Sequence, residues 1–275
     1  MKNTGERHII DEVITDEAEF YNHLMHIATY QFAEKFIIGK RVLDYGCGSG
    51  YGSYSLSLLA EHVKAVDISH ETIEFAKNKY KATNIEYCLV SELNDEKFDV
   101  ITSFQVIEHV TNNKEYINKL KSLLKPNGYL LISTPDKRNR LFNIIQRPWN
   151  IYHLKEYSEL SLKRLLLKQF NTVEILKIGS KSELVTKEIS RDKIQRNITL
   201  PCTLIIYPNF IRIFLLKFQV KIYRLLKGFR KVNLSNNSME NSVKNDFEFK
   251  YTVSDIEFSN DLVLSTDLLA ICKNE

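Results

Sequence analysis

The stretch that decides the fold runs from Val42 to Gly50 and reads Val-Leu-Asp-Tyr-Gly-Cys-Gly-Ser-Gly. A short apolar run leads into three glycines spaced two residues apart, and a helix-compatible segment follows at 50–60. Glycine allows positive φ and close approach to a ligand, and the free amides at a helix N-terminus favour anionic groups. We therefore expect a strand, a tight turn and a helix that bind a small polar cofactor. A dinucleotide fingerprint, G-x-G-x-x-G, would need glycine where this chain has Tyr51.

Short apolar runs alternate with longer helix-compatible segments from 41 to 179, which is typical of a parallel sheet covered by helices. We expect strands at 41–45, 62–67, 84–89, 98–104, 128–134 and 171–178, and helices at 50–60, 70–81, 113–124 and 156–169. Lys125-Pro126-Asn127-Gly128 indicates a helix stop and a turn before the fifth strand. An amphipathic helix is expected at 16–36 and a last strand at 268–273.

The glycine-rich stretch resembles the first motif of class I S-adenosylmethionine-dependent methyltransferases, and later segments keep that resemblance in order. Asp67 closes the second strand, where the family's acidic residue binds both ribose hydroxyls. Ser91 and Glu92 follow the third strand, where the family usually has an acidic residue near the adenine amine. The family's fourth motif is matched by FDVITSFQVIEHV (98–110). The family's fifth strand, with the segment before it, is matched by LLKPNGYLLISTP (123–135).

The resemblance implies an α/β, Rossmann-like open sheet of order 3-2-1-4-5-7-6, with an antiparallel seventh strand and helices on both faces. It also implies S-adenosylmethionine as the cofactor. The binding residues carried over are Asp44, Gly46, Cys47, Gly48, Gly50, Asp67, Ile68, Ser91, Glu92 and Gln105. Ser91 stands at the usual acidic position, with Glu92 one residue away, so ribose recognition is better matched than adenine recognition. We interpret Cys47 as a small residue of the turn and not as a nucleophile.

Two histidines are candidate catalytic bases, because a hydroxyl acceptor must lose its proton during methyl transfer. His109 follows the fourth strand at the carboxyl edge of the sheet, where open α/β folds bind ligands. His153 lies in the loop after the fifth strand, which would overhang the same edge. The alternatives stay open: His109 as a structural residue at a helix start, and His153 as a hydrogen-bonding residue of a lid.

Glu108-His109 also resembles the quinone-biosynthesis O-methyltransferases, in which an E-x-x-E-H segment binds a divalent cation. Gln105 stands here in place of the first carboxylate, and a neutral amide is a poor ligand for a hard cation. We therefore expect no functional metal.

Short motifs at the margins of the core resemble methyltransferases found beside glycosyltransferases in bacterial surface-polysaccharide pathways. They are Gly5-Glu6-Arg7, a helix with His23 and His26, and the segments 134–140 and 152–166. This resemblance implies O-methylation of a sugar or glycan intermediate, free or lipid-linked. One alternative is O- or C-methylation of a quinone-like or small aromatic acceptor. Another is a non-catalytic S-adenosylmethionine-binding or membrane-adaptor protein.

Composition limits the partners and the compartment. The 275 residues carry 38 Lys or Arg and 34 Asp or Glu, a net charge of +4, which is too mild to indicate nucleic acid binding. Four widely spaced cysteines indicate a reducing compartment, and no secretory signal or membrane-spanning run is evident. We expect a cytoplasmic protein, with an N-terminal helical cap (1–40), a core (41–179 and 266–275) and an insertion (180–265) that holds a disordered loop at 235–246.

The segment 210–231 has seven Lys or Arg residues and not one acidic residue. On a helix, Lys217, Lys221, Arg224 and Lys231 share one face, and the other face carries Phe214, Leu215, Phe218, Ile222, Leu225 and Phe229. This pattern fits a helix that docks its apolar side on the core, one that lies on an anionic membrane at the inner face, or an interface between copies.

Overall fold

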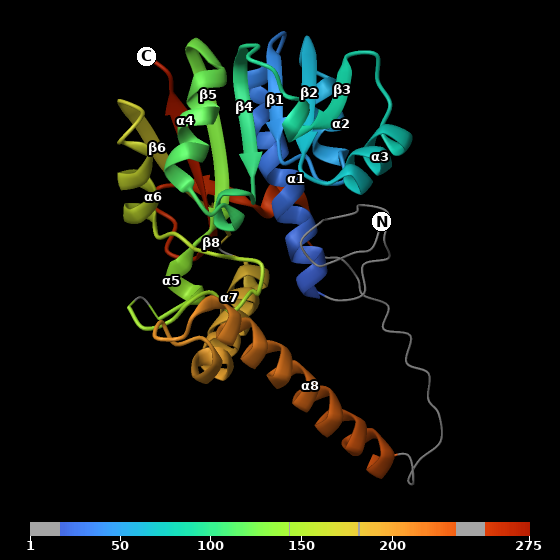
Figure 1. Ribbon diagram of the computed structural model, residues 1–275, viewed down its shortest axis with the longest axis vertical. Coiled ribbons are helices and arrows are strands. Elements are labelled where there is room, and N and C mark those ends of the chain that lie inside the picture. Colours follow the sequence, from blue (N-terminus) through green and yellow to red (C-terminus); the bar gives the residue numbers. More distant parts are fainter. Residues whose placement is uncertain (1–16, 143, 181, 235–250) are drawn as a thin grey trace.

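The fold is organised around an eight-stranded sheet of order β3-β2-β1-β4-β5-β8-β6-β7 (Figure 1). The computed structural model describes residues 17–142, 144–180, 182–234 and 251–275, with 224–234 described as backbone alone. The strands are β1 Arg41–Tyr45, β2 His62–Asp67, β3 Ile85–Leu89, β4 Phe98–Phe104, β5 Leu124–Pro135, β6 Thr172–Gly179, β7 Glu257–Ser259 and β8 Ser265–Lys273. Gly5-Glu6-Arg7 and the loop expected at 235–246 lie outside the described residues.

The expected sheet is confirmed. β8 is the late strand predicted at 268–273, and it pairs antiparallel with β5 on one side and with β6 on the other. β7 is an additional short strand that the sequence pattern did not indicate, and it pairs antiparallel with β6 at the edge.

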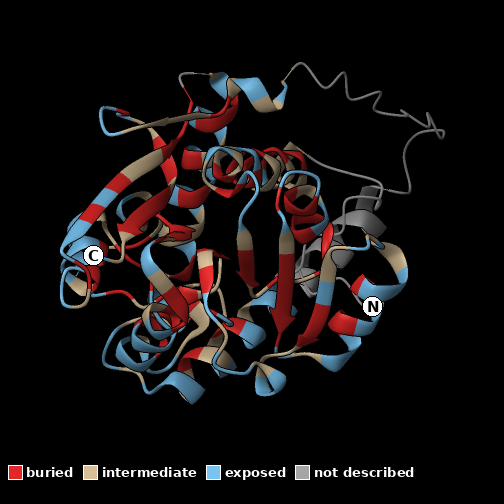
Figure 2. Ribbon diagram, turned by 90° about the horizontal axis from the view of Figure 1, so that it is seen from above, coloured by how far each residue is buried: buried red, intermediate tan, exposed pale blue. Residues whose placement is uncertain are grey.

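The central strands are buried on both faces, which explains their continuous apolar character. Val42 and Leu43 are adjacent in β1, so their side chains point to opposite faces, and both are fully buried. Val42 belongs to a core cluster with α1 and α2, whereas Leu43 belongs to a cluster with α4 and α6. Figure 2 shows the strands buried along most of their length between helices with exposed outer sides.

Helices cover both faces of the sheet, as expected. The α-helices are α1 Glu17–Ile37, α2 Tyr51–Ser57, α3 His70–Lys79, α4 Asn113–Leu123, α5 Lys137–Arg140, α6 Glu159–Leu166, α7 Glu183–Thr199 and α8 Asn209–Leu234. The 3-10 turns are η1 Val90–Glu92, η2 Ile107–His109, η3 Leu200–Cys202 and η4 Val253–Asp255. Local caps set several starts: Ser69 accepts from the Thr72 amide before α3, and Ser158 accepts from the Ser161 amide before α6.

The turn expected at 125–128 is absorbed into β5, which begins at Leu124. Asn127 does adopt a left-handed conformation (φ 61°), as a turn would require. The end of the chain extends the pairing here, because the Asn127 amide donates to the Asn274 carbonyl and the Asn274 amide donates to the Gly128 carbonyl. Contact between residues far apart in sequence thus overrides the local signal.

The segment between β6 and β8 holds α7, α8, η4 and β7, and α8 extends away from the rest of the fold (Figure 1). Within 209–223, Arg212 and Leu216 are buried, whereas Phe210, Phe214, Phe218 and Ile222 are exposed. The interpretation that this helix docks its apolar side on the core is therefore wrong for the described side chains. None of the helices in the described ranges is long and apolar enough to span a bilayer. The division into cap, core and insertion stays a prediction.

Candidate functional site

The glycine turn after β1 is shaped by three left-handed residues, Gly46 (φ 89°), Gly48 (φ 53°) and Gly50 (φ 88°). A Cβ on Gly46 would come within 2.4 Å of Val106, and one on Gly50 within 2.6 Å of Ala76, so both are required by packing. A Cβ on Gly48 would meet no protein atom within 4 Å. The space beside Gly48 is therefore free of described protein atoms, and the main chain there would form a cradle for a cofactor that bound at the turn.

Asp44 lies beneath this turn at the end of β1 and is fully buried. Its carboxylate accepts hydrogen bonds from Ser53 Oγ (2.6 Å), Thr102 Oγ1 (2.9 Å) and Tyr30 OH (3.2 Å). Burial raises the pKa of Asp44 to about 6, although these hydrogen bonds act to lower it. Asp44 thus joins α1, α2 and β4 under the turn, and its expected contact with the cofactor stays a prediction.

Asp67 ends β2 beside the turn. One carboxylate oxygen accepts from the Gly48 amide (3.2 Å) and the other from the Ser69 amide (2.9 Å). Ile68, the next residue, is 84% exposed. The carboxylate is held in one position against the turn and at the start of α3, and its expected contact with a ribose stays a prediction.

The remaining expected cofactor residues differ in their surroundings. Ser91 and Glu92 are exposed in η1, and Glu92 accepts a hydrogen bond from the Leu89 amide (2.9 Å). Cys47 is buried, and burial raises the pKa of its thiol, which opposes the thiolate form that a nucleophile needs. The structure thus agrees with Cys47 as a small residue of the turn.

Gln105 follows β4 in a left-handed conformation (φ 56°), which is uncommon for a residue with a side chain. Its amide Nε2 donates to Asp267 of β8 at 2.9 Å. This side chain faces a second hollow on the same edge of the sheet, which we call the β4–β5 cavity.

The β4–β5 cavity has a volume of about 810 Å³ and lies at the carboxyl ends of β4 and β5. Its wall is completed by α1, α7, β8 and the loop 148–153. Hydrogen-bonding side chains dominate the wall, including Asn22, Gln105, Arg140, Asn150, Asp192 and Gln195. A hollow of this size and polarity suits a small polar acceptor.

His153 lines the β4–β5 cavity and is 5% exposed. Its Nδ1 lies 2.8 Å from Glu156 Oε1, and the Arg140 guanidinium lies 3.3 Å from the other oxygen of that carboxylate. Burial acts to raise the pKa of Glu156, but Arg140 and His153 outweigh it and the pKa is lowered. An ionised carboxylate can only accept a hydrogen bond, so Nδ1 of His153 carries the proton in this contact.

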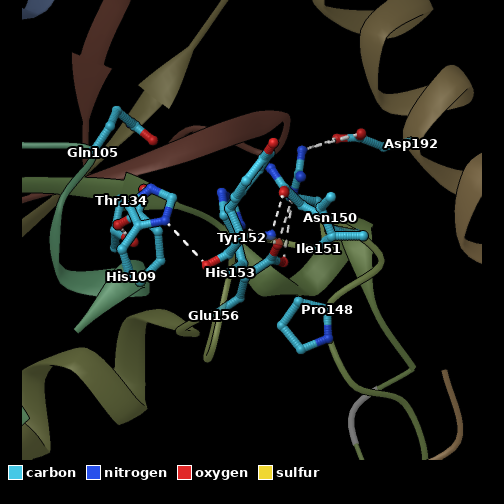
Figure 3. A network of polar contacts seen from close by, with 12 residues as sticks. Gln105, His109, Thr134, Pro148, Asn150, Ile151, Tyr152, His153, Glu156 and Asp192 are labelled. Atoms are coloured by element: carbon cyan, nitrogen blue, oxygen red, sulfur yellow. Dashed lines mark hydrogen bonds and ion pairs between the residues drawn. The ribbon is translucent and has the colours of Figure 1, made fainter. Parts of the chain in front are cut away.

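His109 lies beside His153, with ring centroids 4.9 Å apart in an edge-to-face arrangement. Its Nδ1 is 3.2 Å from the Tyr152 carbonyl, which fixes a donor at Nδ1 (Figure 3). Glu108 is fully buried beneath the pair, and its Oε2 accepts from Thr134 Oγ1 at 2.9 Å. Burial raises the pKa of Glu108 to about 7. Its Oε1 lies 3.9 Å from His109 Nε2 and accepts no hydrogen bond from the described residues.

Glu108, His109 and His153 offer ligand atoms that all lie within 4.8 Å of one another. Gln105 donates its amide Nε2–H to Asp267 and supplies no carboxylate to this group. The arrangement has the residue types of a transition-metal site but lacks the second carboxylate of a hard-cation site. The absence of a functional metal stays a prediction.

Of the histidines expected at the margin of the core, one lines the β4–β5 cavity and the other does not. His26 of α1 lines the β4–β5 cavity, whereas His23, also on α1, is not among its lining residues. Arg7 lies outside the described residues. The cofactor turn and the two histidines are brought to one edge of the sheet, as expected.

Several residues of this site escaped the sequence analysis. Glu156 had a local signal, since an acid three residues after His153 can reach the ring, but Arg140 and Asp192 had none. The Arg140 guanidinium lies 3.2 Å from Asp192 of α7 and stacks on Trp149, with 4.4 Å to the ring centroid. Only the fold brings α5, α7 and the loop 148–153 together.

Comparison with known proteins agrees with this geometry. Residues 38–197 match the family described as Methyltransferase domain. A probable S-adenosylmethionine-dependent methyltransferase of Mycolicibacterium smegmatis is 31% identical over 167 residues, which cover 59% of this chain and 62% of the relative. A ubiquinone biosynthesis O-methyltransferase of Haemophilus ducreyi is 32% identical over 120 residues, which cover 40% of this chain and 51% of the relative. The chain thus spans less than two thirds of the length of either relative.

A solved structure extends the likeness over the whole fold. A SAM-dependent methyltransferase of Thermotoga maritima, described as a possible histamine N-methyltransferase, superimposes with a TM-score of 0.53. The alignment covers 94% of this chain and 95% of that one at 12% identity, which shows a shared fold and nothing more about function. Since the family match covers more than half of the sequence, the chain belongs to the methyltransferase domain family, and S-adenosylmethionine is the cofactor of that domain.

Proposed function

We propose that this protein transfers a methyl group from S-adenosylmethionine to a hydroxyl oxygen of a sugar or glycan intermediate bound in the β4–β5 cavity. The observation that carries the proposal is a chain of hydrogen bonds in the wall of a polar cavity, from His153 to Glu156 and from Glu156 to Arg140. It supplies a positioned base where a hydroxyl acceptor would need one.

The residues around the glycine turn fit the cofactor. The open space above Gly48 admits a ligand against the main chain, and Asp67 presents a fixed carboxylate at the neighbouring strand end. When bound, S-adenosylmethionine supplies an electrophilic methyl group on a sulfonium. Asp67 is the residue that would hold the ribose hydroxyls, and Gly48 is the point of closest main-chain approach.

The wall of the cavity favours an acceptor with several hydroxyl groups. Asn22, Asn150 and Gln195 can donate and accept hydrogen bonds, which suits the hydroxyls of a sugar. Trp149 offers an aromatic surface in the same wall. A flat, largely apolar acceptor would make little use of these hydrogen-bonding groups, so the wall favours an acceptor that carries hydroxyls.

The proton of the acceptor hydroxyl would pass to Nε2 of His153. Glu156 holds the opposite ring nitrogen by accepting its N–H, so the ring keeps one tautomer and one orientation. Arg140 keeps Glu156 ionised, and the imidazolium that forms is stabilised by that carboxylate. His109 packs edge-to-face with this ring and would orient it or the acceptor.

Release of S-adenosylhomocysteine in the presence of different acceptors tests the proposal. We expect turnover with a nucleotide-activated or lipid-linked sugar and little turnover with a catechol of the quinone-precursor type. Turnover with the catechol alone would support the alternative that the Haemophilus ducreyi relative suggests, methylation of a quinone-like acceptor. Binding of S-adenosylhomocysteine without turnover on either class would support a non-catalytic binding protein.

We also propose that the reaction takes place in the cytoplasm or at the inner face of the membrane, without nucleic acid as a partner. The weak net charge of +4 supports the exclusion of nucleic acid. Fractionation of cells that express the chain, with and without nuclease treatment, would check both statements.

A further inference from the structure

The exposed side of α8 forms a continuous apolar row, which we call the α8 stripe: Phe210, Phe214, Phe218 and Ile222. These residues are spaced four apart, so they follow one another along one face of the helix. The rings of Phe214 and Phe218 are stacked, with centroids 6.3 Å apart. Their exposed fractions of 67% and 53% are unusual for such large apolar side chains, which marks the stripe as a contact surface.

Charge around the α8 stripe selects its partner. Lys217 and Lys221 are exposed alongside the stripe, and residues 193–239 contain no Asp or Glu. Two copies pairing through this surface would bring basic residues against basic residues without acidic partners. An anionic bilayer offers both an apolar interior for the stripe and negative head groups for the lysines.

The base of α8 is fixed to the wall of the β4–β5 cavity. Arg212 is buried, and its guanidinium donates to the carbonyl oxygens of Pro148, Asn150, Ile151 and His153, which belong to one loop. That loop lines the cavity through Trp149, Asn150 and His153. Any surface that binds α8 is therefore connected, through Arg212, to the loop that carries His153, the proposed base.

We propose that α8 is a membrane-binding arm whose stripe enters the head-group region of an anionic bilayer and holds the β4–β5 cavity near the membrane surface. The two exposed isoleucines that precede the helix, Ile205 and Ile206, would extend this contact. The consequence for the substrate, an acceptor attached to a lipid, rests on the proposed function. Membrane binding itself does not.

Co-sedimentation of the full chain with vesicles tests the arm. We expect binding to mixed phosphatidylglycerol–phosphatidylcholine vesicles at least ten times tighter than to phosphatidylcholine alone, and weaker at high salt. Each lysine near an anionic surface contributes about fivefold, so Lys217→Gln with Lys221→Gln should weaken binding roughly 30-fold. The matched control, Lys163→Gln on α6 with Lys168→Gln in the turn after it, should bind as the original chain does.

A second pair of variants separates the apolar contribution. Phe214→Ser with Phe218→Ser should abolish binding to anionic vesicles, whereas Leu58→Ser with Leu160→Ser, which alters exposed apolar residues elsewhere, should not. Unchanged binding in both α8 variants would overturn the proposal. So would a dimer in sedimentation velocity that the phenylalanine variant dissociates while no vesicle is bound, since the stripe would then be an interface between copies. Sedimentation needs no acceptor, so a failure of the proposed reaction leaves this test intact.

Discussion

The glycine turn after β1 and the β4–β5 cavity lie on the same edge of one sheet, and they are built in different ways. The turn uses main-chain conformation: three left-handed glycines within five residues, with one side chain, Asp67, bonded to them. The cavity uses side chains drawn from α1, β5, α5, α7, β8, the segment after β4 and the loop 148–153. A site made of main chain depends on φ and on open space, whereas a site made of side chains depends on long-range packing and on charge.

Substitution of Gly48 should produce the largest effect on the main-chain site. Gly48→Val should leave no detectable binding of S-adenosylhomocysteine in calorimetry, because a β-branched residue at φ 53° is strained and its side chain would fill the open space. Gly39 is a matched control, since it also has a positive φ (64°) and no neighbour within 4 Å of an added Cβ. Gly39→Val should bind the cofactor normally. Equal loss in both variants would mean that strain, and not the cradle, explains the result.

His153 tests the side-chain site. His153→Gln should lower turnover by about 10²–10⁴-fold, the range of a general base, with little change in cofactor affinity. His109→Gln should have a smaller effect, because Glu156 orients His153 and not His109. His62→Gln, at the start of β2, is the control. If both the His153 and the His109 variants keep more than about a third of the original turnover, neither histidine is the base.

Burial of Glu108 beneath the histidines should make stability depend on pH. Its pKa is raised to about 7 from an unfolded value near 4.5, so the native state binds the proton more tightly. The associated stability is fully present below about pH 4.5 and is lost as the pH rises through 7, on the order of 3 kcal/mol. Urea unfolding measures the free energy of unfolding at pH 5 and at pH 8. This free energy should fall less between the two pH values in Glu108→Gln than in the original chain. An unchanged decrease, like that expected for exposed Glu115→Gln, would assign the pH dependence to other groups.

Asp67 is the side chain on which the main-chain site depends. Asp67→Ala should weaken binding of S-adenosylhomocysteine more than tenfold, since hydrogen bonds to a charged acceptor contribute about 1.5–3 kcal/mol. Asp67→Asn keeps an acceptor and should lose less. Unchanged affinity in calorimetry would remove Asp67 from the cofactor site.

Chelation should have the smallest effect. We expect EDTA to leave turnover unchanged and Mg²⁺ not to stimulate it, because Gln105 replaces a carboxylate and is bonded to Asp267. Loss of turnover that Zn²⁺ or Mn²⁺ restores would instead make Glu108, His109 and His153 metal ligands.

The sequence by itself determined where the strands and the glycine turn lie, because both follow from local periodicity and from what glycine alone permits. The order of the strands and the role expected of Asp67 came from the resemblance to class I methyltransferases. His109 and His153 could also be assigned to the carboxyl edge, since strand ends fix where loops emerge. The match over residues 38–197 agrees with the resemblance found in the first motif.

Only the tertiary structure decided which side chains meet in the β4–β5 cavity and which side of α8 is exposed. Arg140, Asp192 and Asp267 come from segments that are far apart in sequence, and no local pattern indicates that they share one wall. The sequence predicts an apolar side for the helix at 210–231, but it does not say what that side contacts. In the structure Arg212 is buried and Phe214 is exposed, which is a result of packing. Periodicity predicts which residues share a face of a helix, whereas contacts between distant segments determine what that face packs against.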